Sequence, residues 1–350
     1  MLNLSLPRSW TFDEQKRVLF LRILSTQLKA GRGYQDVFTS MAKSRTAEFR
    51  ELATRSLDAR SEFFASRYGG FYPAKTVSLL ILSQRFNAVT EYIENALSRS
   101  GGHLSSWKIV IKPNLMEIFL LAVGVVGLMA LYLFNDTLSA SLIDLSGTYA
   151  FQAGQFLTTF LIPFFILLAA GTAGYLYFRT SDSPLRKSLK KAALYEQTDS
   201  LFAIEIFRIM GIMTSSNSSK GANPRELIDE IGQIYATNPL RRSQFRKIRA
   251  SLQRGERFTS AIAQSEILAE EELDLFQGMA PNEKISEISA ACKGVAELME
   301  VKLQTQLEFM GKTISAMLLF SLVFVLTLFV DITFGGGLSL FSANDFTVGN

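Results

Sequence analysis

The chain has 350 residues, of which 48% are apolar, and it carries a formal net charge of only +4. A positive mean hydropathy combined with 19% charged residues is typical of an integral membrane protein that also has sizeable soluble parts. A single cysteine and a single histidine exclude an internal disulfide and a zinc site of the usual His/Cys kind.

The basic residues divide the chain into alternating segments. All 36 Lys and Arg residues lie within 1–112 and 179–312. The windows without them hold three long apolar runs, Leu115–Phe134, Phe156–Phe178 and Thr313–Val330. Each run has roughly the 20 residues that a helix needs to cross a membrane. Because cytoplasmic segments beside membrane helices retain Lys and Arg, the pattern predicts three spans, with the N-terminus inside and the C-terminus outside.

In chain order, we expect a cytoplasmic helical domain at 1–112, a transmembrane helix at 113–135, a short periplasmic loop at 136–154 and a transmembrane helix at 155–178. A second cytoplasmic helical domain follows at 179–312, then a third transmembrane helix at 313–334 and a periplasmic tail at 335–350. Met1–Trp10 lacks an apolar stretch of the signal-peptide kind, so we expect no cleaved leader.

The first block has the apolar spacing of helices. Phe20, Leu24 and Leu28 recur on one helix face, and Gly31 follows that helix as a stop. The pattern over Ser56–Tyr68 predicts a helix that ends at the following glycine pair, and two further helices complete the block. No stretch alternates with period 2, so the predicted fold class is all-α, with two cytoplasmic helical bundles and three transmembrane helices.

The second block repeats this layout. Phe202, Ile206, Ile209 and Met213 form an apolar helix face, and Asn223-Pro224 opens the next helix. The segment LLILSQRFNAVTEYI at 79–93 can be laid beside LDLFQGMAPNEKISEI at 273–288 with one inserted residue, and the order of the elements also agrees. These parallels predict an internal duplication. A helix from about Gly294 to Gln306 is expected to continue directly into the third span.

Short motifs in both blocks are similar to those of one family. The segment Phe20–Gly31 is similar to an opening pattern F-x-R-x-L-x-x-L-L-x-A-G, and the aromatic pair before Pro73 is similar to a later aromatic-Pro motif. Gln84 and Gly278 lie in the region of a G-E-x-x-G-x-L turn, in the first and second block. The chain therefore resembles the GspF/PilC family, the inner-membrane platform proteins of type II secretion systems and type IV pili, in a form close to the type IVb or thin-pilus variants.

The resemblance implies two homologous helical cytoplasmic domains, one before a pair of spans and one before a final span, in the bacterial inner membrane. It also implies the partners: a cytoplasmic secretion or pilus ATPase, a pilin or pseudopilin, other inner-membrane assembly proteins and further copies of the chain. Gln84 replaces the Glu of the turn motif in the first block, and Met279 replaces it in the second. A divalent-cation role that depends on that carboxylate is therefore not expected.

Catalytic motifs are scarce. The lone His103 lies in a linker, and no G-x-x-x-x-G-K-[ST] sequence is present to bind nucleotide. We therefore expect no enzyme activity, no cofactor, no metal and no nucleic-acid partner. None of the spans has a charge at its centre, which disfavours an ion or proton path.

A basic stretch at 241–249 is the candidate partner-binding site, with Arg241, Arg242, Arg246, Lys247 and Arg249. Arg242, Arg246 and Arg249 share one helix face. They are able to contact an acidic partner or the anionic lipids of the inner leaflet, to form a solvated face, or to pair with the nearby acidic run 270–272.

Small residues in the spans are candidates for close helix packing: Gly124 and Gly127 in the first span, and Ala170 and Gly174 in the second. Packing within one protomer and packing between protomers both remain open.

Together these features favour a platform protein that couples a cytoplasmic assembly ATPase to the extraction of pilin or pseudopilin and to filament assembly. The alternative is a non-catalytic membrane subunit of a transporter or of a lipid-processing complex.

Overall fold

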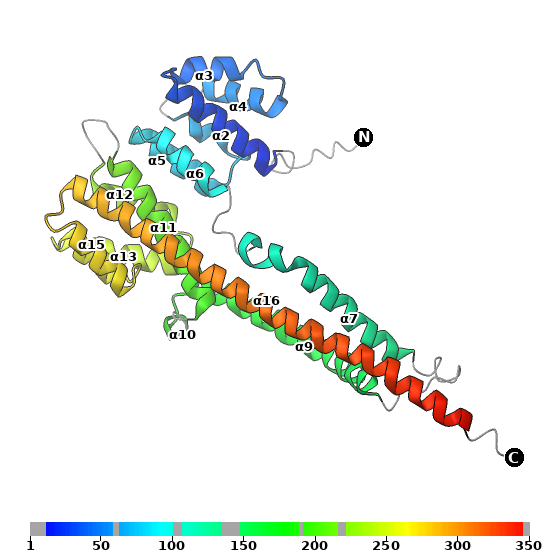
Figure 1. Ribbon diagram of the computed structural model, residues 1–350. Helices are drawn as coiled ribbons and strands as arrows, with labels where there is room; N and C mark the ends of the chain where they lie inside the picture. Colours follow the sequence, from blue (N-terminus) through cyan, green and yellow to red (C-terminus); the bar gives the residue numbers. More distant parts are fainter. Residues whose placement is uncertain are drawn as a thin grey trace. The chain divides into compact units, whose positions relative to one another are not determined.

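The computed structural model describes residues 12–58, 63–100, 107–134, 148–188, 192–215 and 222–345 (Figure 1). Within these ranges the regular structure is helical and no β-strand forms, which confirms the all-α prediction. The chain divides into two compact units. One contains Met1–Gly102 and Phe178–Leu303, and the other contains His103–Tyr177 and Gln304–Asn350.

The first half of the former unit consists of α2 (Glu14–Lys29), α3 (Tyr34–Met41), α4 (Ala47–Leu57), the 3-10 helix η1 (Phe64–Tyr68), α5 (Ala74–Arg85) and α6 (Val89–Ser100). Asp13 caps α2 by accepting a bond of 2.8 Å from the Lys16 amide. Gly31 follows α2 with a φ of +78°, a conformation that glycine adopts without strain. The helix predicted over 56–68 was wrong, because α4 ends at Leu57 and η1 is a separate 3-10 turn.

Aromatic rings fill the core of this half. Phe12, Phe20, Tyr68 and Phe71 are buried, and Phe12 meets Phe71 edge to face at 5.6 Å between ring centroids. Phe20 meets Tyr68 in the same way at 5.7 Å. Such edge-to-face pairs stabilise a core by about 0.5–1.5 kcal/mol beyond the area that they bury.

The second half contains α10 (Pro184–Ser188), α11 (Ala193–Ser215), α12 (Pro224–Ile234), α13 (Pro239–Gln253), α14 (Phe258–Gln264), α15 (Glu270–Met279) and the beginning of α16 (Ile285–Asp345). An Asn-Pro pair starts both α12 and α13, with the asparagine side chain accepting from a first-turn amide. The helices α11 and α16 are in contact at Gly211 and Ser289, because Ser289 Oγ donates to the Gly211 carbonyl at 3.0 Å.

The other unit contains η2 (Trp107–Ile111), η3 (Lys112–Asn114), α7 (Leu115–Leu133), α9 (Tyr149–Thr180) and the remainder of α16. Two helices of the described residues are long and apolar enough to cross a membrane: Ile109–Leu133 and Ile285–Asp331. The helix α9 reaches a third such span only if its two arms, which meet at a bend of 47° just before Pro163, are counted together. Proline causes such bends because it lacks an amide proton and its ring clashes with the preceding turn.

The predicted continuity into the last span is confirmed, because α16 is one helix over Ile285–Asp345. It also passes through the glycines at 335–337, where the sequence predicted a tail. Near the far end of the apolar region, Asp331 accepts a bond of 2.9 Å from the Tyr149 amide at the start of α9. That carboxylate satisfies an amide that the helix itself leaves unpaired.

Candidate functional site

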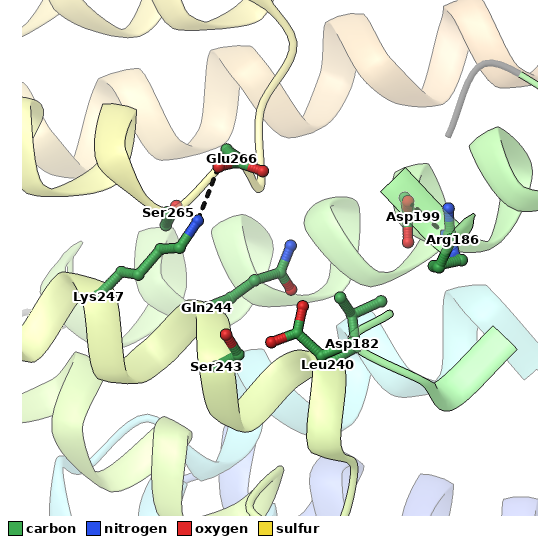
Figure 2. A pocket seen from close by; sticks show the side chains of 9 residues that line it. All are labelled: Asp182, Arg186, Asp199, Leu240, Ser243, Gln244, Lys247, Ser265 and Glu266. Carbon is green, nitrogen blue, oxygen red and sulfur yellow. Dashed lines mark hydrogen bonds and ion pairs between the residues drawn. The ribbon is translucent and has the colours of Figure 1, made fainter. Parts of the chain in front are cut away.

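A small polar cavity lies among α10, α11 and α13, in the second half of the first unit (Figure 2). Its volume is about 30 Å³, which is room for one or two water molecules. Its lining residues are Asp182, Arg186, Asp199, Leu240, Ser243, Gln244, Lys247, Ser265 and Glu266. The cavity is too small for a metabolite, so the charged side chains around it act on each other.

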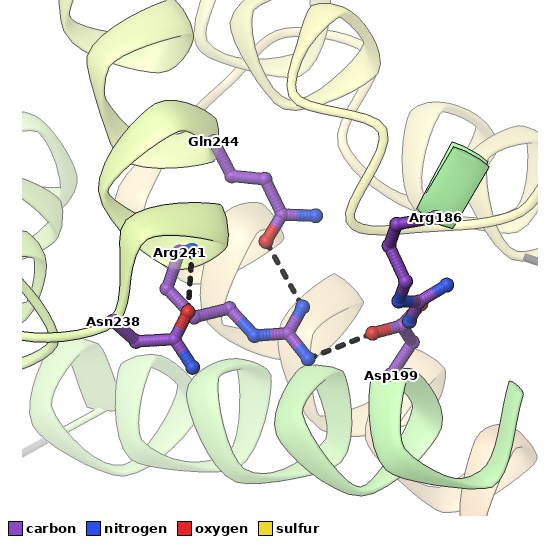
Figure 3. A network of polar contacts seen from close by, with 5 residues as sticks. All are labelled: Arg186, Asp199, Asn238, Arg241 and Gln244. Atoms are coloured by element: carbon purple, nitrogen blue, oxygen red, sulfur yellow. Dashed lines mark hydrogen bonds and ion pairs between the residues drawn. The ribbon is translucent and has the colours of Figure 1, made fainter. Parts of the chain in front are cut away.

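One carboxylate in this wall holds two arginines (Figure 3). Asp199 on α11 accepts from Arg241 Nη2 on α13 at 2.7 Å and from Arg186 Nη2 on α10 at 2.7 Å. Arg186 is 2% exposed and Arg241 is 4% exposed. Two aromatic rings face the guanidinium groups, Tyr195 at 4.4 Å from Arg186 and Phe202 at 3.8 Å from Arg241. This cluster ties three helices together in a setting where an unpaired charge is costly.

Arg241 is therefore placed differently from the expectation that it belongs to a solvent-facing basic stretch. Its Nη1 donates to Gln244 Oε1 at 3.0 Å, and its amide is capped by Asn238 Oδ1 at 3.2 Å. It points inward because it shares the face of α13 that also buries Gln244, Phe245 and Ile248. Burial lowers the pKa of the Arg241 guanidinium, while the Asp199 carboxylate opposes that shift.

Arg242, Arg246 and Arg249 are exposed on α13, as the helix-face analysis predicted. Arg242 Nε donates to the Ala236 carbonyl at 2.7 Å, and Arg249 Nε donates to Asp229 Oδ1 at 2.9 Å. Arg246 makes no hydrogen bond or ion pair with any part of the chain that the structure describes. These three side chains form what we name the α13 basic face.

The acidic run does not pair with the basic stretch. Glu271 and Glu272 both accept from Lys302 Nζ on α16, at 3.2 Å and 2.9 Å. Lys247 instead bonds Glu266 at 2.7 Å, at the edge of the polar cavity. Pairing within the domain is thus real, but its partners are not the neighbouring charge runs.

The two halves of the first unit meet along a charged seam, which we define as the contacts of α5 and α6 with α11 and α12. Lys75 Nζ lies 2.6 Å from Glu205 Oε2 and 4.7 Å from the centre of the Tyr235 ring. Arg85 Nη2 lies 3.0 Å from Glu226 Oε1, and its other terminal nitrogen bonds Glu230. Such half-exposed ion pairs each contribute only about 0–1 kcal/mol to stability.

The predicted small residues of the spans separate into two groups. A side chain added at Gly124 would meet Val325 of α16, and one added at Gly127 would meet Phe329. Both glycines therefore serve packing within one protomer. Ala170 is exposed, and an added Cβ at Gly174 would meet nothing within 4 Å, so this part of α9 has no such packing among the described residues.

The family-motif positions lie at helix ends. Gly31 follows α2 and Pro73 directly precedes α5, while Gln84 is in the last turn of α5 and Gly278 in the last turn of α15. Among the described residues, no group of three or more His, Cys, Asp or Glu side chains is placed to hold a metal ion. His103 lies outside the described residues.

Sequence reasoning missed Asp199, although a signal for it exists. Tyr195, Asp199, Phe202 and Ile206 follow one another at helical spacing, so Asp199 is a charge on an apolar face. A charge at such a position needs a buried partner. Arg186 offered no comparable signal, because its own helix is only one turn long.

These observations define the protein as an all-helical one with two or three helices that are able to span a membrane. Compared with known proteins, the chain matches no family model and no curated protein.

Proposed function

We propose that this protein is an inner-membrane platform of a type IV pilus or type II secretion machine, which couples a cytoplasmic assembly ATPase to the extraction of pilin or pseudopilin and to filament assembly. The observation that carries the proposal is a repeated arrangement of six elements, once before the first two spans and once before the last. Such a duplication is the feature that the GspF/PilC resemblance implies.

The repeat can be followed element by element. The order α2, α3, α4, η1, α5, α6 corresponds to α11, α12, α13, α14, α15 and the start of α16. The first element packs against the sixth in each half, since α2 contacts α6 and Gly211 of α11 contacts α16. The second element packs against the third, the third against the fourth and the fourth against the fifth in both halves.

The turn before the sixth element supports the same correspondence. Asn87 has a φ of +54°, and it lies two residues before α6. Glu283 also has a φ of +54°, and it lies two residues before α16. Left-handed backbone is uncommon for residues other than glycine, so its recurrence at matching turns favours a common origin of the halves.

The membrane part of the proposal has three spans, with α9 bent at Pro163 as the second one. Both helical halves then lie in the cytoplasm with the N-terminus, and the C-terminus lies in the periplasm, as the distribution of Lys and Arg indicates. In that arrangement most of the folded mass faces the ATPase, and the spans face the apolar helix of the pilin.

The α13 basic face is the proposed docking surface for the ATPase or for another assembly protein. Arg242 and Arg246 are its test residues, because neither forms an ion pair with the described part of the chain. Arg249 and Lys247 already have acidic partners in the chain. The region of α9 around the exposed Ala170 and the half-buried Gly174 is the proposed contact with a second copy or with the pilin helix.

Co-purification tests the docking surface. The double charge reversal Arg242→Glu with Arg246→Glu should abolish capture of the assembly ATPase by the full-length protein in detergent. The matched control reverses Arg225 and Lys284, which are exposed in the same half but outside α13, and it should leave capture unchanged. Equal capture by the two double variants would refute the α13 basic face as the docking surface.

A further inference from the structure

A second cavity lies in the unit that contains His103–Tyr177 and Gln304–Asn350, where α7 and α16 begin their apolar stretches. Its volume is about 370 Å³, within the range of about 300–1,000 Å³ that is usual for small-molecule sites. One wall comes from the chain just before α7, with Ile109, Pro113 and Asn114. The opposite wall comes from successive turns of α16, with Glu308, Lys312 and Ser315.

The first wall is held in place by its own contacts. Asn114 is 3% exposed, and its Nδ2 donates to the Val110 carbonyl at 2.6 Å. Gly311 lets this segment approach α16 closely, since an added Cβ would lie 3.2 Å from the Ile109 carbonyl oxygen. The first wall is therefore fixed by close backbone packing against α16.

The second wall presents an anion, a cation and a hydroxyl in order. Glu308 and Lys312 are four residues apart, in the orientation that normally favours a salt bridge along a helix. They form none. Glu308 Oε1 accepts from Gln304 Nε2 at 2.9 Å, and Lys312 has no hydrogen bond or ion pair with the described residues. The carboxylate and the ammonium group thus both remain available to a ligand that carries both charges.

A phosphoethanolamine group has the matching chemistry. Its phosphate oxygens accept from an ammonium group and a hydroxyl, as Lys312 and Ser315 provide, and its own ammonium donates to a carboxylate such as Glu308. A choline headgroup has no N–H to donate to Glu308, and a glycerol headgroup has no cation. The cavity lies where the apolar runs start at Leu115 and Thr313, which is the level of the lipid headgroups in the proposed membrane arrangement.

We propose that this cavity binds the headgroup of phosphatidylethanolamine, with Lys312 and Ser315 on the phosphate and Glu308 on the ammonium group. The acyl chains lie along the exposed apolar surface that follows, where Met116 and Met317 are 64% and 65% exposed. This inference rests on the membrane topology of the proposed function, but not on the ATPase or the filament.

Lipid retention by the full-length protein tests the site. The protein is purified in detergent, incubated with dioleoyl phosphatidylethanolamine, phosphatidylglycerol or phosphatidylcholine, and analysed by native mass spectrometry. We expect retention of phosphatidylethanolamine above the other two. Lys312→Gln should weaken it by about tenfold, since it removes a charge-assisted hydrogen bond. Glu308→Gln should abolish the preference over phosphatidylglycerol.

Lys293→Gln is the matched control, because it neutralises a lysine of the same helix that does not line the cavity. It should retain lipid like the unmodified protein. Equal retention by the Lys312→Gln and Lys293→Gln variants would overturn the site. Displacement of the lipid by free phosphoethanolamine at equal concentration would overturn the lipid assignment in favour of a soluble phosphate ester.

Alkaline carbonate extraction separates this inference from the proposed function. Release of the protein from membranes by carbonate would contradict the spans themselves. A protein that resists carbonate but shows no preference among the three lipids would contradict the headgroup site alone.

Discussion

The carboxylate of Asp199 is predicted to stabilise the second helical half more than any exposed acid of that half. Asp199→Asn keeps the size of the side chain but leaves Arg186 and Arg241 as buried cations without a counter-charge. Removing one partner of a buried ion pair costs about 3–5 kcal/mol. Because the Asp199 side chain is 16% exposed, water offsets part of that cost, and we expect about 3 kcal/mol.

The chain offers its own reporter for this loss. Cys292 is the single cysteine of the sequence and is fully buried in the second half. A thiol reagent therefore modifies it only when that half opens. When reclosing is faster than modification, the rate follows the opening equilibrium, so about 3 kcal/mol corresponds to labelling that is roughly a hundredfold faster.

The matched control is Asp229→Asn, which makes the same change at a half-exposed ion pair with Arg249. It should alter the labelling rate by less than about fivefold, because exposed pairs contribute about 0–1 kcal/mol. A combined replacement of Arg186, Asp199 and Arg241 by leucine or methionine should slow labelling again relative to Asp199→Asn. Equal labelling rates in Asp199→Asn and Asp229→Asn would refute the account of the cluster.

Two further predictions concern acid stability and helix packing. Glu283 Oε1 and Oε2 accept from Thr259 and Phe258 at the start of α14, and although burial raises the pKa of Glu283, these bonds outweigh it and lower the pKa. Its contribution is therefore present above the unfolded pKa of about 4.3 and is lost as the pH falls through the folded pKa. The Cys292 labelling rate is divided by the rate of the unfolded chain at the same pH, which removes the pH dependence of the thiolate itself. Glu283→Gln should flatten the remaining dependence of this ratio on pH below about 5, and an unchanged profile of the ratio would contradict the prediction. Gly154→Val should lower the thermal midpoint of the full chain in detergent, because the new side chain would press on the backbone of α7. Gly171→Val is the control and should leave the midpoint unchanged, because an added Cβ there meets nothing within 4 Å. Equal midpoints of the two variants would contradict the close packing of α9 against α7 at Gly154.

The all-helical class and the long apolar helices could be predicted because they depend on patterns that are local in sequence. The periodicity of apolar residues defines helices, and the pair Asn223-Pro224 defines the first turn of α12. The bend of 47° in α9 lies just before Pro163, but no bend was predicted there.

The polar clusters could not be predicted as readily, because their partners are distant in sequence. Arg241 and Asp199 are 42 residues apart, and Lys302 lies 30 residues from Glu272. A charge run shows which helix face is polar, but it does not show which member the packing turns inward. That is why Arg242, Arg246 and Arg249 were placed correctly on an exposed face while Arg241, next to them, was not.

The ends of α4 and α16 were predicted wrongly because local sequence patterns do not by themselves determine where a helix stops. Apolar spacing continued past Leu57, yet the chain ends α4 there, and the glycines at 335–337 looked like a stop, yet α16 passes through them. Glycine costs only about 1 kcal/mol in a helix interior, so a long helix is able to contain several.

The most direct test of the platform proposal is a clean deletion of the gene in the organism that encodes it, scored for surface filaments and for the location of the pilin-like subunit. The proposal predicts that filaments disappear while the subunit accumulates in the inner membrane, and that the wild-type gene restores them. Normal filaments in the deletion strain would contradict it.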